Sequence, residues 1–420
     1  MKTIPLIIKT SLTLSLTLLT ALNAEAAFTS PNSVEGTLIE NELPDTSFFR
    51  LESVDNFFTP YNAWKASIKK DHNLHFGGDY QTLYQNANPS LTDKEAFSGV
   101  FRVYGTYKAY NADSANSGSL IFKVENRHTL GSHLDAQNYG FSAGYYGITG
   151  TLFGEYIQGS GWGVTNLFWK QYLNEGTTTV QVGILDPTDY LGVYGLMNPM
   201  TAFSNLAFSS DQSMFLPNQG LGLAAASMLG DNFYVIAGIN DANADAQEAG
   251  FDTFFDDNEY FTSVEIGWTT GQDRIYFDNI HVTLWHVDEH SKFNASPEGW
   301  GANFSAAWFV EDTWMPFLRA GYSKDGAALM QKNVSVGVGY YVNQTRDLLG
   351  VGLNWADPSD DSLKDQTTAE IFYRVQLAQS IAITPSIQYL KDPALYTNLE
   401  DPALSESSMW LFGVRARFTF

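Results

Sequence analysis

The chain has 420 residues, with 46 acidic residues against 23 basic ones and a formal net charge of −23. Such acidity argues against nucleic acid as a partner, because nucleic acid is bound by clustered Lys and Arg. There is no cysteine, so the fold is held without disulfides.

The first 26 residues have the pattern of a secretory signal peptide. Lys2 and Lys9 supply positive charge, residues 12–22 form a short apolar core, and 24–26 (Ala-Glu-Ala) fit a small-x-small cleavage site. The core is too short for a membrane anchor, which needs about 20 apolar residues. We therefore expect a signal peptide at 1–26 and an exported mature chain.

The segment that follows, 27–72, is expected to lie in the periplasm ahead of the main domain. Residues 28–48 are expected to be a flexible lead-in. Residues 51–70 have the apolar spacing of a short amphipathic helix, which Pro60 is expected to interrupt.

From residue 73 onward the chain alternates apolar and polar residues in one short segment after another, which is the pattern of a strand with one apolar face. After the signal no apolar run reaches 18 residues, but a strand crosses a membrane with only about 9–11. Sixteen such strands are predicted, at 73–84, 97–110, 119–130, 163–173, 177–185, 221–229, 232–240, 258–270, 274–287, 299–310, 313–323, 332–343, 347–357, 366–376, 379–390 and 407–420.

The lengths of the connections decide whether a further apolar stretch at 149–157 is a strand. Bacterial outer-membrane barrels have an even number of strands, short periplasmic turns and long outer loops. Short links fall at every second connection, and counting 149–157 as a strand breaks this alternation, whereas placing it inside one outer loop, 131–162, keeps it. We therefore predict an all-β fold: one 16-stranded antiparallel transmembrane β-barrel over 73–420, with both termini periplasmic.

The final strand indicates which face of the barrel points to lipid. Phe412 and Phe418 alternate with Arg415 and Arg417, and a charged side chain on the lipid face costs about 2–4 kcal/mol at the bilayer midplane. The arginines must therefore face the lumen. The same test turns nine basic side chains inward: Arg102, Lys108, Lys123, Arg127, Lys170, Arg319, Arg374, Arg415 and Arg417.

Four of these bases, Arg102, Lys123, Arg127 and Lys170, lie on neighbouring strands and therefore on one wall. A barrel of sixteen strands is wide enough for a water-filled channel, so this wall is a candidate pore lining. The competing interpretation is that each base forms a salt bridge with a neighbouring acid or only keeps the lumen soluble.

Two motifs resemble metal sites, and each lacks a part. The stretch 241–252 begins like a calcium loop, but Ala246 stands where Gly is needed and Asp252 where Glu is usual. His286 and His290 have no evident third ligand. No hydrolase, phosphate-loop or zinc-protease motif is present. We therefore assign no catalytic, cofactor or metal residue and do not expect an enzyme.

The helix expected at 51–70 is followed by Gly77-Gly-Asp-Tyr80. Further motifs lie at Val180–Tyr190, Phe203–Phe208, Pro217–Gly222, Val235–Ala242 and Pro316–Ser323. By their order and spacing over most of the mature chain, these segments resemble the OprB-type carbohydrate-selective porins, a family of outer-membrane β-barrels. The helix and the Gly77–Tyr80 motif are similar to the family's opening.

The resemblance implies passive diffusion of sugars through the outer membrane of a Gram-negative bacterium, with the long connections 131–162 and 186–220 folded inward. Sugar hydroxyls need polar partners at a constriction, and the four wall bases supply donors. The remaining candidates are the acceptors Glu125, Glu155, Asp186 and Asp189 and the rings Tyr145, Tyr146, Trp162 and Tyr190. The rings could equally belong to the aromatic girdle at the lipid headgroups.

Two other functions remain open at this point. The basic wall fits a general or anion-preferring porin, and the long acidic loops fit a surface adhesin or interaction protein. Outer-membrane lipids and lipopolysaccharide, which divalent cations could bridge to the acidic loops, are expected partners. The apolar outer band fits a monomer and a homotrimer alike.

Overall fold

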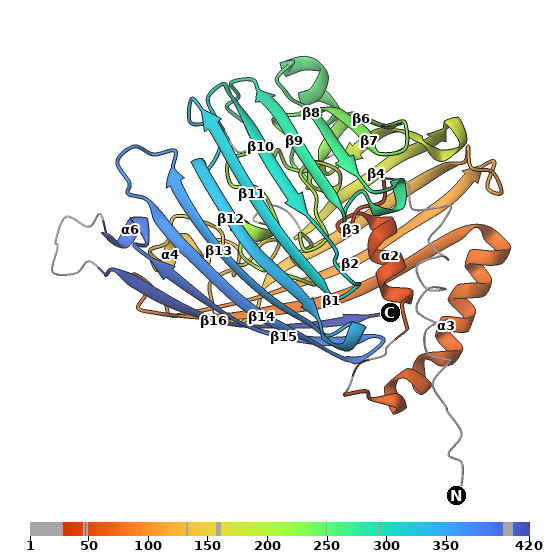
Figure 1. The fold of residues 1–420 in the computed structure, drawn as a ribbon, viewed down its shortest axis with the longest axis horizontal. Coiled ribbons are helices and arrows are strands. Elements are labelled where there is room, and N and C mark those ends of the chain that lie inside the picture. Colours follow the sequence, from red (N-terminus) through yellow and green to blue (C-terminus); the bar gives the residue numbers. More distant parts are fainter. Residues whose placement is uncertain are drawn as a thin grey trace, which may run out of the picture.

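A computed structural model describes residues 28–44, 47, 49–131, 133–156, 161–248, 250–292, 295–397 and 406–420. Each strand pairs antiparallel with its neighbours in the chain, and the first pairs with the last to close one barrel (Figure 1). The strands are β1 (Leu74–Asn88), β2 (Glu95–Tyr110), β3 (Gly118–Thr129), β4 (Trp162–Leu173), β5 (Thr178–Leu185), β6 (Gly220–Leu229), β7 (Phe233–Asp241), β8 (Tyr260–Thr269), β9 (Asn279–Val287), β10 (Gly299–Ala307), β11 (Trp314–Lys324), β12 (Met330–Tyr341), β13 (Leu348–Pro358), β14 (Gln366–Ala378), β15 (Ile381–Lys391) and β16 (Ser408–Thr419). The predicted closed barrel of sixteen antiparallel strands is confirmed.

Two helices precede the barrel, α2 (Val34–Glu42) and α3 (Glu52–His72). Short helices lie in the connections: α4 (Tyr139–Ala143), α5 (Leu206–Ser209) and α6 (Ala394–Thr397). Among the described residues, no helix is both long and apolar enough to cross a membrane.

The expected flexible lead-in is wrong for residues 34–42. Helix α2 begins after Ser33, whose hydroxyl accepts a hydrogen bond from the Gly36 amide at 3.1 Å, a typical N-cap. Val34 and Leu38, one helical turn apart, are buried inside the barrel. Tertiary burial therefore stabilises a helix that is too short to form alone.

The expected break at Pro60 is also wrong, because α3 continues through it. Contacts on both sides of the proline hold the helix. Before it, the Asp55 carboxylate accepts a hydrogen bond from the Gln379 amide at 2.8 Å. After it, the Trp64 ring lies 5.7 Å from the Phe76 ring. These contacts offset the one backbone hydrogen bond that Pro60 cannot make.

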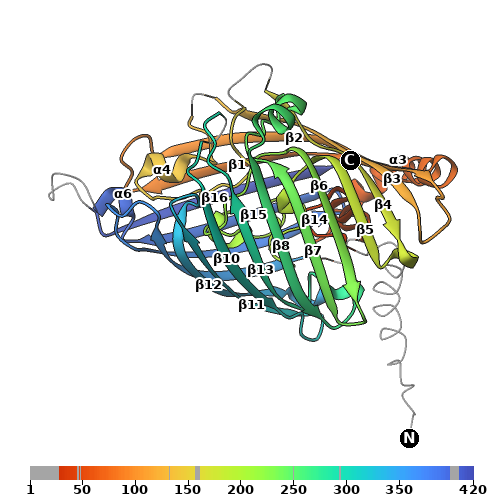
Figure 2. The ribbon, with the colours of Figure 1, turned by 90° about the horizontal axis from the view of Figure 1, so that it is seen from above.

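The final strand has the expected orientation. Phe412 and Val414 are 48% and 46% exposed, whereas Arg415 and Arg417 are 3% and 6% exposed. Short connections such as 174–177 and 379–380 lie at the end where both helices also lie, which we call the turn end (Figure 2). The opposite end is the loop end.

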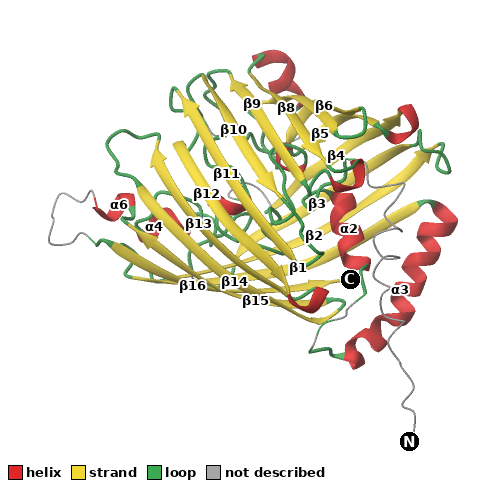
Figure 3. Ribbon diagram, in the orientation of Figure 1, coloured by secondary structure: helices red, strands yellow, loops and turns green. Residues whose placement is uncertain are grey.

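The two longest connections start from the loop end and fold back into the barrel. They are the second loop, 130–161, and the lumen loop, 186–219. Figure 3 shows these irregular segments within the ring of strands. The second loop is shifted by one residue from the expected 131–162, and the lumen loop is one residue shorter than the expected 186–220, because Trp162 and Gly220 already belong to strands.

A buried ionic cluster joins the strands where the barrel closes. Asp79 of β1 is fully buried and accepts two hydrogen bonds from Arg102 of β2, at 2.8 and 2.6 Å. It also accepts one from Arg417 of β16, at 3.2 Å. Tyr104 donates a further hydrogen bond to the same carboxylate at 3.2 Å. One carboxylate therefore joins the first, second and last strands.

We predict that Asp79→Asn lowers the free energy of unfolding by about 3–5 kcal/mol, because it leaves two buried arginines without their counter-charge. Chemical unfolding in detergent, followed by tryptophan fluorescence, measures the change. Asp113→Asn, at an exposed position between β2 and β3, is the matched control and should unfold like the wild type. Equal unfolding midpoints for both variants would contradict the role of the cluster.

Candidate functional site in the barrel lumen

Two buried glutamates of the wall hold the lumen loop through its backbone amides. Glu370 of β14 accepts hydrogen bonds from the Ser204 amide at 2.9 Å and the Asn205 amide at 3.0 Å. Glu265 of β8 accepts one from the Gly192 amide at 2.8 Å. Carboxylates bound to backbone amides make strong, charge-assisted hydrogen bonds. They fix the loop on opposite walls of the barrel.

Three predicted pore-lining arginines bind the carbonyl groups of the same loop. Arg319 of β11 donates to Gly192 at 3.0 Å and also to Ser210. Arg374 of β14 donates to Thr201 at 3.2 Å, and Arg415 of β16 donates to Ala202 at 2.8 Å. All three arginines are less than 9% exposed. The structure therefore places them under the loop, where they hold its backbone.

Two inward glycines on β12 and β13 allow the lumen loop to lie directly on the wall. A Cβ on Gly352 would lie 2.7 Å from the Phe208 ring of the loop, and one on Gly339 would lie 2.8 Å from a methyl group of Leu196. They pair across the strands with Gly337 and Gly350, where a Cβ would instead meet rings of the wall. Glycine is required at Gly339 and Gly352 because a larger residue would displace the loop.

The second loop is hydrogen-bonded to the lumen loop. The Thr151 amide donates to the Ser204 carbonyl at 3.0 Å, and the Leu206 amide donates to the Ile148 carbonyl at 2.9 Å. Tyr145 is fully buried and its hydroxyl lies 2.5 Å from that of Thr368. Tyr146 is partly buried. Its backbone amide donates to Gln366 at 3.3 Å. The Tyr145 ring is thus part of the packing between loop and wall, whereas the Tyr146 ring packs on Phe141 of the same loop, with ring centroids 5.6 Å apart.

The predicted basic wall is present, and each base in it has an acidic partner. Arg102 binds Asp79, as described above. Arg127 donates to Glu125 at 2.8 and 3.0 Å, and the Lys123 ammonium lies 3.9 Å from the same carboxylate. Lys170 lies 2.5 Å from Glu35 of α2. The positive charge of the wall is therefore compensated locally.

Beside this wall, the start of the lumen loop carries the predicted acceptors Asp186 and Asp189. Asp186 accepts hydrogen bonds from Thr188 and from Gln219, the latter at 2.9 Å. Asp189 accepts one from Asn166 of β4 at 3.0 Å. Tyr190 donates to Asn240 of β7 at 2.6 Å. The acids thus lie close to the strands that carry Lys123 and Lys170.

Asp189 has an unusual acidity in this position. Burial raises the pKa of its carboxyl to about 7; the Lys123 charge opposes this shift, and the Asp186 charge adds to it. Desolvation disfavours the charged form of an acid. Asp189 therefore changes its charge near neutral pH.

Helix α2 crosses the lumen near the turn end. Glu35 binds Lys170 of β4, and Glu40 binds Arg374 of β14 at 2.8 Å. Asn41 donates to Tyr104 of β2 at 2.7 Å and accepts from Arg417 of β16 at 2.9 Å. Before the helix, the Pro31 carbonyl accepts from Asn198 of the lumen loop at 2.8 Å. The helix is thus bound to several parts of the wall and to the loop.

Glu40 remains ionised in this position. Burial disfavours its charge, but the charges of Arg374, Arg417 and Arg346 outweigh that effect and hold its pKa below the usual value. The contact with Arg374 is therefore a true ion pair.

Two predicted pore residues do not lie in the lumen. Glu155 is exposed and accepts a hydrogen bond from Thr129 at 2.5 Å. Trp162 is 44% exposed on the outer face, where its ring packs against the Phe101 ring, with ring centroids 6.0 Å apart. Thr165 is an extra residue in β4, at a bulge where the pairing of β3 with β4 shifts. Residues of β4 before the bulge therefore have the opposite inward and outward alternation from residues after it, such as Lys170. Strict alternation had placed Trp162 inward, and that expectation is wrong.

The buried acids that hold the lumen loop, the closing strands and α2 were not among the predicted site residues. Asp79, Glu265 and Glu370 all lie at inward positions of their strands, so the alternation that selected the bases also marks them. Glu35 and Glu40 could not be found in this way, because α2 was not expected.

The acidic connection between β7 and β8 forms its own contacts outside the lumen. Asp241 accepts a hydrogen bond from Thr253, and Asp257 binds Lys292, which lies in the connection between β9 and β10, at 2.6 Å.

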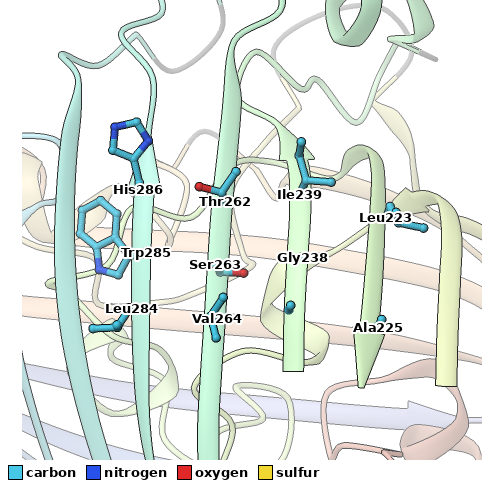
Figure 4. A pocket seen from close by; sticks show the side chains of 11 residues that line it. Leu223, Ala225, Gly238, Ile239, Thr262, Ser263, Val264, Leu284, Trp285 and His286 are labelled. Atoms are coloured by element: carbon cyan, nitrogen blue, oxygen red, sulfur yellow. The ribbon is translucent and has the colours of Figure 1, made fainter. Parts of the chain in front are cut away.

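A hollow of about 570 Å³ lies on the outer wall, over β6 to β9 (Figure 4). Its rim includes Leu223, Val264 and Leu284, which are 47%, 43% and 55% exposed. The small side chains of Ala225 and Ala237 leave the space between them. An apolar hollow on the outer face is unsuited to a polar solute.

Comparisons with solved structures show the same fold. A high-pH structure of Pseudomonas putida OprB has a TM-score of 0.66 and 14% identity, over 86% of this chain and 97% of that one. The low-pH structure of the same protein has a TM-score of 0.50 and 11% identity, over 86% of this chain and 97% of that one. A variant of the Rh. blastica porin has a TM-score of 0.51 and 12% identity, over 83% of this chain and 100% of that one.

A search of the curated proteins finds no match. The family model described as "Carbohydrate-selective porin, OprB family" matches residues 85–420. Because this match covers most of the 420-residue chain, the protein belongs to the OprB family of carbohydrate-selective porins.

Proposed function

We propose that this protein is an outer-membrane porin through which neutral sugars diffuse passively, in a Gram-negative bacterium. The observation that carries the proposal is the pairing of charges in the lumen. Arg102, Arg127, Lys170 and Arg374 each lie within 3 Å of a carboxylate. Such pairs leave little net field for selecting ions but many hydrogen-bonding groups.

The solute path we propose runs between the basic wall and the start of the lumen loop. A sugar entering it loses water, and each lost hydrogen bond needs a replacement. Lys123 and Arg127 supply donors on one side, and Asp186 and Asp189 supply acceptors on the other. The sugar must bind weakly so that it can leave again.

The paired charges favour this function over an anion-preferring porin. An anion channel needs basic groups whose charge is not already compensated by nearby acids. Here Arg127 is paired with Glu125, Arg102 with Asp79 and Lys170 with Glu35, and of the four wall bases only Lys123 shares its nearest carboxylate with another of them. A neutral solute gains the hydrogen bonds of these groups without competing with their ion pairs. The chain functions as a channel, and we assign no chemical reaction to it.

Helix α2 and the lumen loop together narrow the lumen in the proposed channel. The loop narrows it midway along the barrel, and α2 narrows it near the turn end. We infer that α2 limits the rate at which solutes leave, because it is bound across the lumen from β4 to β14.

Liposome swelling tests the proposed solute class. Glucose and gluconate are similar in size and differ in charge, so a channel for neutral sugars should admit glucose faster. Arg102→Ala/Arg127→Ala should lower the rate of glucose entry, because two hydrogen-bond donors are lost. It should lower the rate of gluconate entry further, because the negative charges of Asp79 and Glu125 lose their counter-charges. Lys332→Ala, which removes an exposed base paired with Asp357, is the matched control.

Faster entry of gluconate than of glucose would support the anion-preferring porin instead. Reconstituted protein that admits neither solute and conducts no ions would favour an adhesin.

The ion preference should depend on pH through Asp189. A carboxyl with a pKa near 7 is neutral below that pH and negative above it. We therefore expect cation preference to rise between about pH 6 and pH 8, as the new charge offsets Lys123. Reversal potentials in a KCl gradient measure this change. In Asp189→Asn the rise should disappear; a rise that persists would assign the titration to another group.

Releasing α2 should widen the channel. In Glu35→Gln/Glu40→Gln the helix loses its ion pairs to Lys170 and Arg374 of the wall, and breaking a buried pair costs about 3–5 kcal/mol. Single-channel conductance should therefore increase. Asp113→Asn, which changes an exposed acid outside α2, is the control. A conductance equal to that of the wild type would show that α2 does not limit flow.

A further inference from the structure

Helix α3 lies outside the barrel, at the turn end (Figures 1 and 2). Its first turn is fixed to the turn between β14 and β15, where the Leu51 amide donates to the Leu377 carbonyl at 2.6 Å. None of its residues is fully buried. Neither the folding of the barrel nor passage of a solute through the lumen explains a helix of 21 residues in this position.

The helix contacts the face of the barrel that points to lipid. Phe58 packs on Phe418 of β16, with ring centroids 5.6 Å apart. Trp64 packs on Phe76 of β1, with centroids 5.7 Å apart. Phe418 and Phe76 lie at outward positions of their strands, since the alternating residues Arg417 and Asp79 are buried. The helix is therefore continuous with the end of the apolar outer band.

A second side of the helix is aromatic and uncovered. Phe57 is 76% exposed and Trp64 is 51% exposed. Seven residues separate them, so they project from the same side. The adjoining side, about 100° around the helix axis, carries the small or polar exposed residues Asn56, Ala63 and Ser67. In water, each large apolar ring left uncovered forgoes the favourable free energy of burial.

Lys65 has the arrangement of a basic residue at a membrane surface. Its ammonium group lies 5.5 Å from the centroid of the Tyr61 ring and 5.8 Å from that of the Phe76 ring. The aliphatic part of such a side chain can lie along apolar groups while its charge reaches water or a headgroup. Aromatic and basic residues mixed in this way are typical of the boundary between acyl chains and headgroups.

We propose that α3 lies in the interface of the phospholipid leaflet at the turn end, with Phe57 and Trp64 inserted at the boundary of the acyl chains. Asn56, Ala63 and Ser67 then face water. The continuity of the helix with the lipid-facing band identifies a lipid surface as the partner. An amphipathic helix with one apolar and one polar side binds such a surface in its plane. The inference is independent of the solute that the channel admits.

Single-cysteine labelling tests the position of the helix, since the chain contains no cysteine. An environment-sensitive fluorophore is attached at Phe57→Cys and, as the matched control, at the neighbouring Asn56→Cys. Each protein is reconstituted into phosphatidylcholine vesicles, with a nitroxide on the acyl chains or with iodide on both sides. The nitroxide should quench the label at 57 at least twice as strongly as at 56, and iodide should show the reverse order.

Equal iodide quenching at both positions, with no nitroxide quenching, would place α3 in water and overturn the proposal. Protection of position 57 from both quenchers would also overturn it, because a protein rather than lipid would then cover this side. Trp64→Cys with Ala63→Cys as its control repeats the test if Phe57→Cys does not fold. Swelling assays on the same vesicles show that the barrel is intact, so failure of this inference is distinguishable from failure of the channel.

Discussion

The backbone of the lumen loop needs hydrogen-bond partners inside the barrel, and this requirement organises the lumen. A buried segment without regular structure leaves amide and carbonyl groups unpaired, each at a cost of about 1–3 kcal/mol. The wall supplies carboxylates for the amides and arginines for the carbonyls. Glu370 and Arg415, on β14 and β16, bind the loop within a few residues of each other. Charged side chains that would line an empty barrel therefore serve here to hold a backbone.

The same arrangement explains why an acidic protein places so many bases inward. The bases are distributed between two tasks, which are binding the loop and balancing inward acids. Arg319 binds the loop, Arg102 balances Asp79, and Arg374 does both, since it contacts Thr201 and Glu40. Charge in the lumen is thus used in pairs. This leaves a polar but nearly balanced passage, which suits solutes that carry hydroxyl groups and no charge.

The barrel could be predicted from sequence because its determinants are local. Alternation along each strand marks the outer face, and the arginines of the last strand indicate which face is inner. The same reasoning failed at Trp162, where one extra residue at Thr165 reverses the alternation within a single strand. It also failed for α2, because nine residues with two buried apolar side chains give no clear pattern on their own. The loop anchors join residues between 73 and 213 positions apart, and no local pattern contains such pairs.

The position of α2 implies an order of assembly. Asn41 contacts Tyr104 on β2 and Arg417 on β16, and these strands lie on either side of β1 only when the barrel is closed. Glu35 and Glu40 reach bases on β4 and β14, which are far apart in the sequence. An open sheet would offer the helix the partners on β2 and β4 or those on β14 and β16, but not both sets. The complete set of contacts of α2 therefore requires the closed barrel, so closure at Asp79 favours the docking of the helix.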